Sequence, residues 1–297
     1  MVHKYFICPD FMFGTPTYDT LSYFYQNNPE IFYEGRSIYS VFGAYPGMIW
    51  MGGGSFLTGN IISAEQMKEA LDFYNNNCGI RITYTFTNPL LEEKHLYDTY
   101  CNKALEVLSK TSGNAVLVSS ELLENYIRKY YPSIAICKSI IGTENKNYFP
   151  DEKYALTVMR RSCNMDIDFL KNIPQEHKKK IELLCTDPCP DNCPRIYDHY
   201  KAYANSVLSF SHNIPGVECS MDSRKGNFEK HFRNTQLKTF ISPEKVNELS
   251  DMGYRFFKLS GRGSIPTIVE NNLEYLIKPE YQRDLREIIY AKYLKNN

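Results

Sequence analysis

The sequence predicts an α/β barrel of the (β/α)8 type, with an aromatic N-terminal extension and a helical C-terminal tail. Apolar runs of strand length alternate with amphipathic stretches of helical length, repeating every ~25 to 40 residues. A chain of 297 residues is long enough for such a barrel, which commonly forms one domain of this size. We expect the extension at 1–36, the barrel at 37–265 and the tail at 266–297.

The expected strands are β-branched or apolar runs that end at turn residues. In chain order they lie at 37–44, 80–86, 115–118, 134–141, 156–159, 181–184, 239–241 and 256–259. The expected helices have apolar residues at helical spacing, and the clearest starts carry an N-cap hydroxyl, as at Ser63 and Ser242. They lie at 18–25, from 63, at 92–110, 121–130, from 166, and at 196–208, 242–252 and 281–293.

Charge and composition restrict the range of partners. Lys plus Arg equals Asp plus Glu at 34 each, so no global field favours a nucleic acid or an anionic membrane. The first residues are too short an apolar run for a signal peptide, and no stretch approaches about 18 apolar residues. We expect a soluble cytoplasmic protein without a membrane partner.

Three cysteines fall within nine residues, at Cys185, Cys189 and Cys193. They follow the strand expected at 181–184, and the prolines between 188 and 194 exclude a continuous helix. Thiolates are soft ligands for zinc, copper(I) or iron-sulfur clusters, and disulfides are the alternative. Zinc is the less typical choice, because zinc-binding cysteines usually come in Cys-x-x-Cys pairs.

Other candidate site residues come after the expected strands, where barrel enzymes place their chemistry. His199, just beyond the cysteines, is a candidate general acid or base. Glu182 needs a cationic partner if it points into the barrel, and Lys258 is the natural one. The remaining candidates are polar or basic residues for binding substrate: Asn88, Ser119, Arg160, Asn164 and Arg262.

Two stretches resemble the collagenase-like peptidase family. The first is Ile241-Ser242-Pro243-Glu244 with the helix that follows, and the second runs from Gly253 to Leu259-Ser260-Gly261-Arg262. The resemblance covers residues 37–265. It implies a barrel whose relatives bind an iron-sulfur cluster through four cysteines and hydroxylate RNA bases or a quinone precursor without oxygen. The family's peptidase label is older.

Carried over by position, the resemblance gives Cys189 and Cys193 as the first two cluster ligands and Cys219 as the third. The family's fourth ligand lies near Val246, where this chain has no cysteine, so Cys185 or Cys163 would complete the set. Lys258 and Arg262 lie in the most specific motif and would hold the substrate.

We therefore expect an enzyme that carries an iron-sulfur cluster and acts on a small polar or anionic substrate. One alternative is a peptidase or other hydrolase that uses a thiolate or a bound zinc. Another is a noncatalytic barrel that binds a ligand or a partner subunit, with the cysteines as a structural clip. Neither Gly-x-Ser-x-Gly nor His-Glu-x-x-His occurs, so serine-hydrolase and zinc-protease signatures are absent from the sequence.

Overall fold

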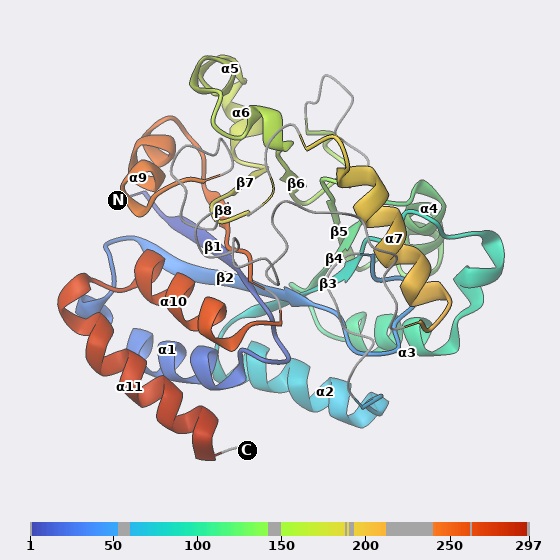
Figure 1. Ribbon diagram of the computed structural model, residues 1–297, viewed down its shortest axis with the longest axis horizontal. Coiled ribbons are helices and arrows are strands. Elements are labelled where there is room, and N and C mark those ends of the chain that lie inside the picture. The colour runs from blue at the N-terminus through green and yellow to red at the C-terminus, as the bar shows by residue number, and fades with distance from the viewer. Residues whose placement is uncertain are drawn as a thin grey trace.

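The computed structural model describes residues 2–52, 60–141, 150–187, 189, 193–211, 240–261 and 263–295. Eight parallel strands form a closed barrel in chain order, with β8 pairing back onto β1 (Figure 1). Helices surround the strands, as in a TIM-type α/β barrel. This confirms the predicted fold class.

The strands are short, and most are followed by a loop and at least one helix. Among the described residues, the connection from the fifth strand to the sixth contains no helix. Their bounds are β1 (Lys4–Pro9), β2 (Arg36–Gly43), β3 (Arg81–Phe86), β4 (Ala115–Val118), β5 (Ala135–Lys138), β6 (Thr157–Val158), β7 (Ile181–Leu184) and β8 (Phe256–Lys258).

The α-helices are α1 (Thr15–Asn27), α2 (Ala64–Asp72), α3 (Thr99–Leu108), α4 (Glu121–Tyr130), α5 (Ile167–Asn172), α6 (Gln175–Lys178), α7 (Ile196–Leu208), α9 (Pro243–Asp251), α10 (Ile265–Leu276) and α11 (Pro279–Lys295). Short helical turns complete the connections: η1 (Pro29–Ile31), η2 (Phe73–Asn77), η3 (Glu93–Tyr97) and η4 (Arg161–Cys163).

The first strand lies inside the segment 1–36, which was predicted as an extension outside the barrel. That boundary is wrong, because β1 pairs with β2 on one side and with β8 on the other. The pairing with β8 closes the barrel through contacts far apart in the sequence, which no local pattern reveals. The strand expected at 239–241 is also absent among the described residues there: Phe240 forms only an isolated bridge with Thr186, and Thr239 lies outside them.

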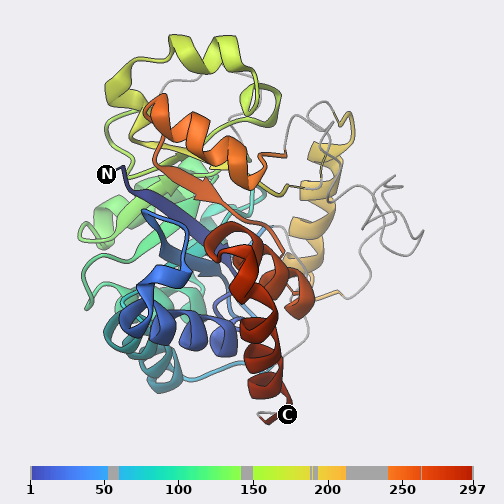
Figure 2. The ribbon, with the colours of Figure 1, turned by 90° about the vertical axis from the view of Figure 1, so that its left-hand side faces the viewer.

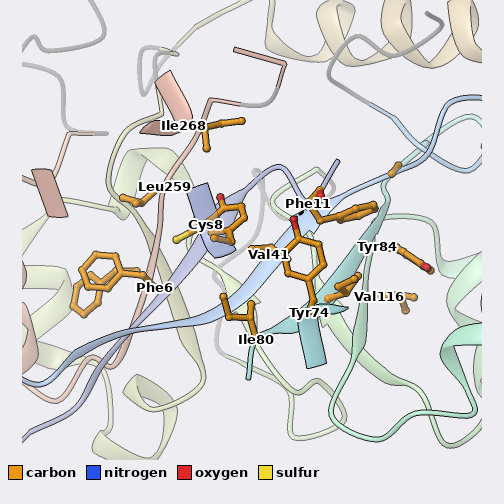
Figure 3. Close-up of a cluster of buried hydrophobic side chains, with 14 of the residues drawn as sticks. Phe6, Cys8, Phe11, Val41, Tyr74, Ile80, Tyr84, Val116, Leu259 and Ile268 are labelled. Atoms are coloured by element: carbon orange, nitrogen blue, oxygen red, sulfur yellow. Dashed lines mark hydrogen bonds between the residues drawn. The ribbon is translucent and has the colours of Figure 1, made fainter. Parts of the chain in front are cut away.

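Two separate apolar cores stabilise the barrel. The larger core lies between the strands and the surrounding helices, and Figure 3 shows part of it, including Leu259, Ile268 of α10, and Phe6 and Cys8 of β1. The smaller core contains Ile7, which alternates with those two residues and so points into the lumen. Burial of each large apolar side chain stabilises the fold by about 1.5–3 kcal/mol.

The C-terminal helices pack against the start of the chain. Figures 1 and 2 show α11 beside α10 and α1. The Tyr293 hydroxyl lies 2.9 Å from Thr17 Oγ1, and Lys292 Nζ lies 2.7 Å from Asp19 Oδ2. α10 is the helix that follows the last barrel strand, so the expected tail is part of the barrel's helical layer. Among the described residues, no helix is long and apolar enough to cross a membrane.

Candidate functional site

The ends of β6 and β7 are joined by a buried network of polar side chains. Arg161 donates from Nε to Asp187 Oδ2 at 2.8 Å, and its Nη2 lies 2.7 Å from the same oxygen. Nη2 also donates to the Tyr200 hydroxyl of α7 at 2.7 Å. The network therefore links the turn after β6, the loop after β7 and the first turns of α7 at the carboxyl end of the barrel.

Asp187 also orders the loop that carries the cysteines. Its second oxygen, Oδ1, accepts a hydrogen bond of 2.9 Å from the Cys189 backbone N–H. Hydrogen bonds to ionised groups are among the stronger ones in proteins. One carboxylate thus connects Arg161 to the backbone of Cys189.

The cysteines of this region face different environments. Cys189 and Cys193 are half-buried at the carboxyl end of the barrel, whereas the other six described cysteines are buried. No disulfide joins any of the eight described cysteines. Partial exposure is typical of a reactive thiol, whereas a thiol buried in apolar surroundings is inert.

Cys185 is directed away from the other two. It continues the alternation of β7, so that Leu184 belongs to the lumen core and Cys185 to the core beneath the helices. Burial raises the pKa of Cys185 well above its ordinary value. A protonated thiol enclosed in an apolar core is poorly placed to share a metal with Cys189.

The described residues do not supply the ligand set of a four-cysteine cluster. Among them, no group of three or more His, Cys, Asp or Glu side chains is arranged to hold a metal ion. Cys219 lies outside the described residues. Cys163 is buried, and its Sγ accepts a hydrogen bond from Arg160 Nε at 2.9 Å. Of the expected ligands, Cys189 and Cys193 are the ones that are described and half-buried on the loop after β7.

Two of the expected substrate-binding residues hold the backbone instead. Asn164 donates to the Leu184 carbonyl at 2.7 Å and accepts from the Leu184 N–H at 2.8 Å. Asn88 donates to the Ile49 carbonyl and accepts from the Leu90 N–H, each at 2.9 Å. Both asparagines are fully buried, so their amide groups fix loops at the barrel mouth.

The other expected site residues are spread around the carboxyl end. Ser119 follows β4, and its buried hydroxyl has no hydrogen-bond partner among the described residues. His199 is half-buried on α7, with its ring 5.4 Å from that of Tyr203. Arg160 is half-buried and lies over the ring of Phe169 at 5.9 Å. Arg262 lies outside the described residues.

The expected pairing of Glu182 with Lys258 is confirmed. Lys258 Nζ lies 2.8 Å from Glu182 Oε1 inside the barrel, over the ring of Phe42 at 4.2 Å. The contact is an ion pair rather than an aligned hydrogen bond, because Oε1 receives no hydrogen bond of proper geometry. The pair lies within the lumen, not among the loops of the mouth.

Apolar side chains pack around this ion pair in the lumen. Phe42, Val158 and Leu184 form one cluster with Ile140 and Ile141. Val158 pairs with Glu182 and Leu184 pairs with Lys258 along the neighbouring strands, so both lie level with the ion pair. The ion pair inside the barrel shares no residue with the polar network at the mouth.

Sequence reasoning missed Asp187 and Asp10. Asp187 is an acidic residue within the cysteine loop, and its spacing two residues after Cys185 was the available signal. Asp10 follows β1, is 1% exposed, and accepts a hydrogen bond from the Met12 N–H at 3.1 Å. It was missed because the strand that places it at the mouth was not recognised.

The chain is similar to a curated protein of Methanocaldococcus jannaschii named as an uncharacterized protease. The two are 21% identical over 195 residues, which cover 64% of this chain. The chain spans 57% of the length of that relative. No protein-family model matches the chain. The similarity indicates distant homology to a protein named as a protease.

Proposed function

We propose that this protein is a thiol-dependent α/β-barrel enzyme, related to the collagenase-like peptidases, whose active site is the carboxyl end of the barrel around Cys189 and Cys193. One observation carries the proposal: the two half-buried cysteines among the eight described ones both belong to the segment after β7. In barrels of this type, catalytic groups come from the loops at that end.

The residues around the loop suit a polar or anionic substrate. Arg161 is already neutralised by Asp187, so it positions the loop and does not offer a free charge. Arg160, its half-buried neighbour, has a guanidinium suited to bind a carboxylate or phosphate. We assign His199, on the helix that follows the cysteine loop, the role of the base that activates a thiol. A peptide is within this substrate class, and the distant relative is named as a protease.

A more specific proposal adds an iron-sulfur cluster and oxygen-independent hydroxylation. This addition rests on the family resemblance alone. Such a cluster would take Cys189 and Cys193 as ligands and would need further ligands from outside the described residues, where Cys219 lies. We derive no reaction step through it, because the described residues do not complete the ligand set.

The proposal is tested by substrate consumption in mixtures. Protein purified without oxygen and kept reduced is incubated with a peptide library and, separately, with a mixture of small polar metabolites, and untargeted mass spectrometry follows the components. We expect at least one component to be consumed by the wild type, and Cys189→Ser/Cys193→Ser to abolish the consumption. Cys78→Ala, which removes a buried thiol far from the loop, is the matched control.

The outcomes separate the candidate functions. Consumption confined to the peptide library assigns a peptidase, and consumption confined to the metabolites assigns a small-molecule enzyme. No consumption in either mixture, or equal consumption by the double variant, contradicts the proposal. The noncatalytic binding barrel would then be the better account of the fold.

A further inference from the structure

A cavity of about 170 Å³ enters the barrel lumen from its amino end, opposite the cysteine loop. Its rim is formed by exposed residues at or before the starts of β3 to β6: Arg81, Gly113, Ala135 and Ala155. Its inner wall includes Glu182 and Lys258. The ion pair inside the barrel is therefore reached from this end.

Small side chains keep the cavity open. Barrel interiors are usually filled by layers of bulky branched residues. Here alanines stand at positions 115, 135 and 155, on or beside three neighbouring strands, and a glycine stands at 113. The small residues at these positions leave the volume open, and a bulky side chain directed into it would occupy part of it.

The inner end of the cavity presents the carboxylate of Glu182. Glu182 is 2% exposed, and its shielded Oε1 has Lys258 Nζ at 2.8 Å without an aligned hydrogen bond. A buried carboxylate is stabilised by hydrogen-bond donors around it. A ligand carrying a hydroxyl or amino group would add such a donor from the cavity, which this residue lines. Cys137 lies beside the pair and also lines the cavity.

The rim of the cavity is positively charged. The Arg81 guanidinium lies over the ring of Tyr39 at 4.3 Å, and no carboxylate among the described residues forms an ion pair with it. Arg81 and Lys258 carry two positive charges against the one negative charge of Glu182, so the lining has an excess of one positive charge. A guanidinium in this position suits a carboxylate.

The volume and the remaining walls set the size and shape of a ligand. A cavity of about 150 Å³ is known to hold benzene, so this one admits a ligand of about six to eight non-hydrogen atoms. Ile7, Leu117 and Leu156 line its sides, which suits a short aliphatic body. A donor group at one end and a carboxylate at the other complete the match.

We infer that the amino end of the barrel is a binding site for a small aliphatic carboxylate that carries a hydroxyl or amino group. The hydroxyl or amino group donates to Glu182, and the carboxylate faces Arg81. The site lies at the opposite end of the barrel from Cys189 and is independent of the function proposed above. It would let a small metabolite stabilise the barrel without entering the active site.

Calorimetric titration with lactate, alanine and propionate tests the inference. Propionate has the carboxylate and the aliphatic body of lactate but lacks the donor. We expect lactate or alanine to bind wild-type protein with a dissociation constant in the millimolar range or below, and propionate to bind about tenfold more weakly. Arg81→Met is expected to weaken the binding of all three.

Two variants block the cavity without touching its charged groups. Ala135→Phe and Ala155→Phe each place a ring at the rim, at exposed positions. Both are expected to abolish binding, whereas Ala291→Phe, at an exposed position on α11, is expected to bind like the wild type. Thermal unfolding of each variant confirms that it is folded.

Three results would overturn the inference. They are the absence of binding to wild-type protein at the highest soluble ligand concentration, equal binding of lactate and propionate, and unchanged binding in both blocked variants. None of these results concerns the cysteine loop, so the proposed function is tested independently of this inference.

Discussion

Arg161 and Asp187 form a nearly buried ion pair at the carboxyl end of the barrel, with Arg161 Nη2 2.7 Å from Asp187 Oδ2 and side-chain exposures of 8% and 11%. The other oxygen of Asp187 accepts from the Cys189 N–H. The pair fixes the start of the cysteine loop relative to β6. The ion pair positions the thiols and does not itself react.

Replacing Arg161 is expected to loosen the loop. In Arg161→Met, Asp187 loses its cation while still partly buried, so we expect a loss of stability of about 3 kcal/mol and faster alkylation of Cys189. Urea unfolding and mass spectrometry of alkylated peptides measure the two effects. Arg160→Met is the matched control, because Arg160 does not contact Asp187 in the described structure. Equal alkylation of Cys189 in both variants would show that Arg161 does not order the loop.

Replacements of Glu182 and Lys258 are expected to have strongly non-additive effects on the free energy of unfolding. Lys258→Met leaves Glu182 buried without a counter-ion, at a cost of about 3 kcal/mol. Adding Glu182→Gln to Lys258→Met removes the uncompensated charge and restores most of the stability. Urea unfolding of the two single variants and the double variant gives the coupling free energy. Additive losses would mean that water in the cavity already screens the pair.

Glu124 on α4 is expected to make stability depend on pH. Burial alone would raise the pKa of Glu124, but hydrogen bonds from Tyr154, Lys153 and Arg128 outweigh it and hold the pKa below the ordinary value. The Tyr154 hydroxyl donates to Oε2 at 2.6 Å. A lowered pKa in the folded state adds stability that is fully present above the unfolded pKa of about 4.3 and is lost as the pH falls through the folded pKa.

Glu124→Gln is therefore expected to cost about 1–3 kcal/mol at neutral pH. The difference from wild type should shrink below about pH 4, where the wild-type carboxylate becomes protonated. Urea unfolding between neutral pH and pH 3 follows this change. Glu121→Gln, at an exposed position on the same helix, should show little effect at any pH. A difference for Glu124→Gln that does not change with pH would contradict this account.

The metal content of the protein is expected to depend on Cys189 and Cys193 and not on Cys185. Iron, zinc and acid-labile sulfide are measured per chain on protein purified without oxygen. Any metal held at the loop should be lost in Cys189→Ser/Cys193→Ser and retained in Cys185→Ala, because Cys185 lies in the core beneath the helices. A four-iron cluster, as the resemblance implies, would give about four irons and four sulfides. Equal loss of metal in Cys185→Ala would place that thiol at the metal.

Much of the barrel could be predicted from sequence, because most strands are β-branched runs bounded by turns. The strand Lys4–Pro9 could not be predicted in this way. It contains one β-branched residue, Ile7, and it is defined by pairing with β8, about 250 residues away along the chain. Closure of the barrel is a tertiary property that the local pattern does not contain.

The candidate site was predictable in part. The pairing of Glu182 and Lys258 followed from the rule that a buried charge needs a partner, and it was confirmed. The direction of Cys185 also follows from the period of two along β7, once Glu182 is placed inside. The network of Arg161, Asp187 and Tyr200 joins three separate segments, so its geometry could be seen only in the folded chain.

The most direct test of the central claim is a map of native-state alkylation rates. Reduced, metal-free protein is treated with iodoacetamide at neutral pH, and mass spectrometry gives a rate for each cysteine. Cys189 and Cys193 should react at least ~100-fold faster than Cys185 and Cys137, since thiolate fraction and exposure control reactivity. Burial raises the pKa of Cys137 to about 12. Slow reaction of Cys189 and Cys193, at the rates of the buried thiols, would contradict a reactive thiol site at the carboxyl end of the barrel.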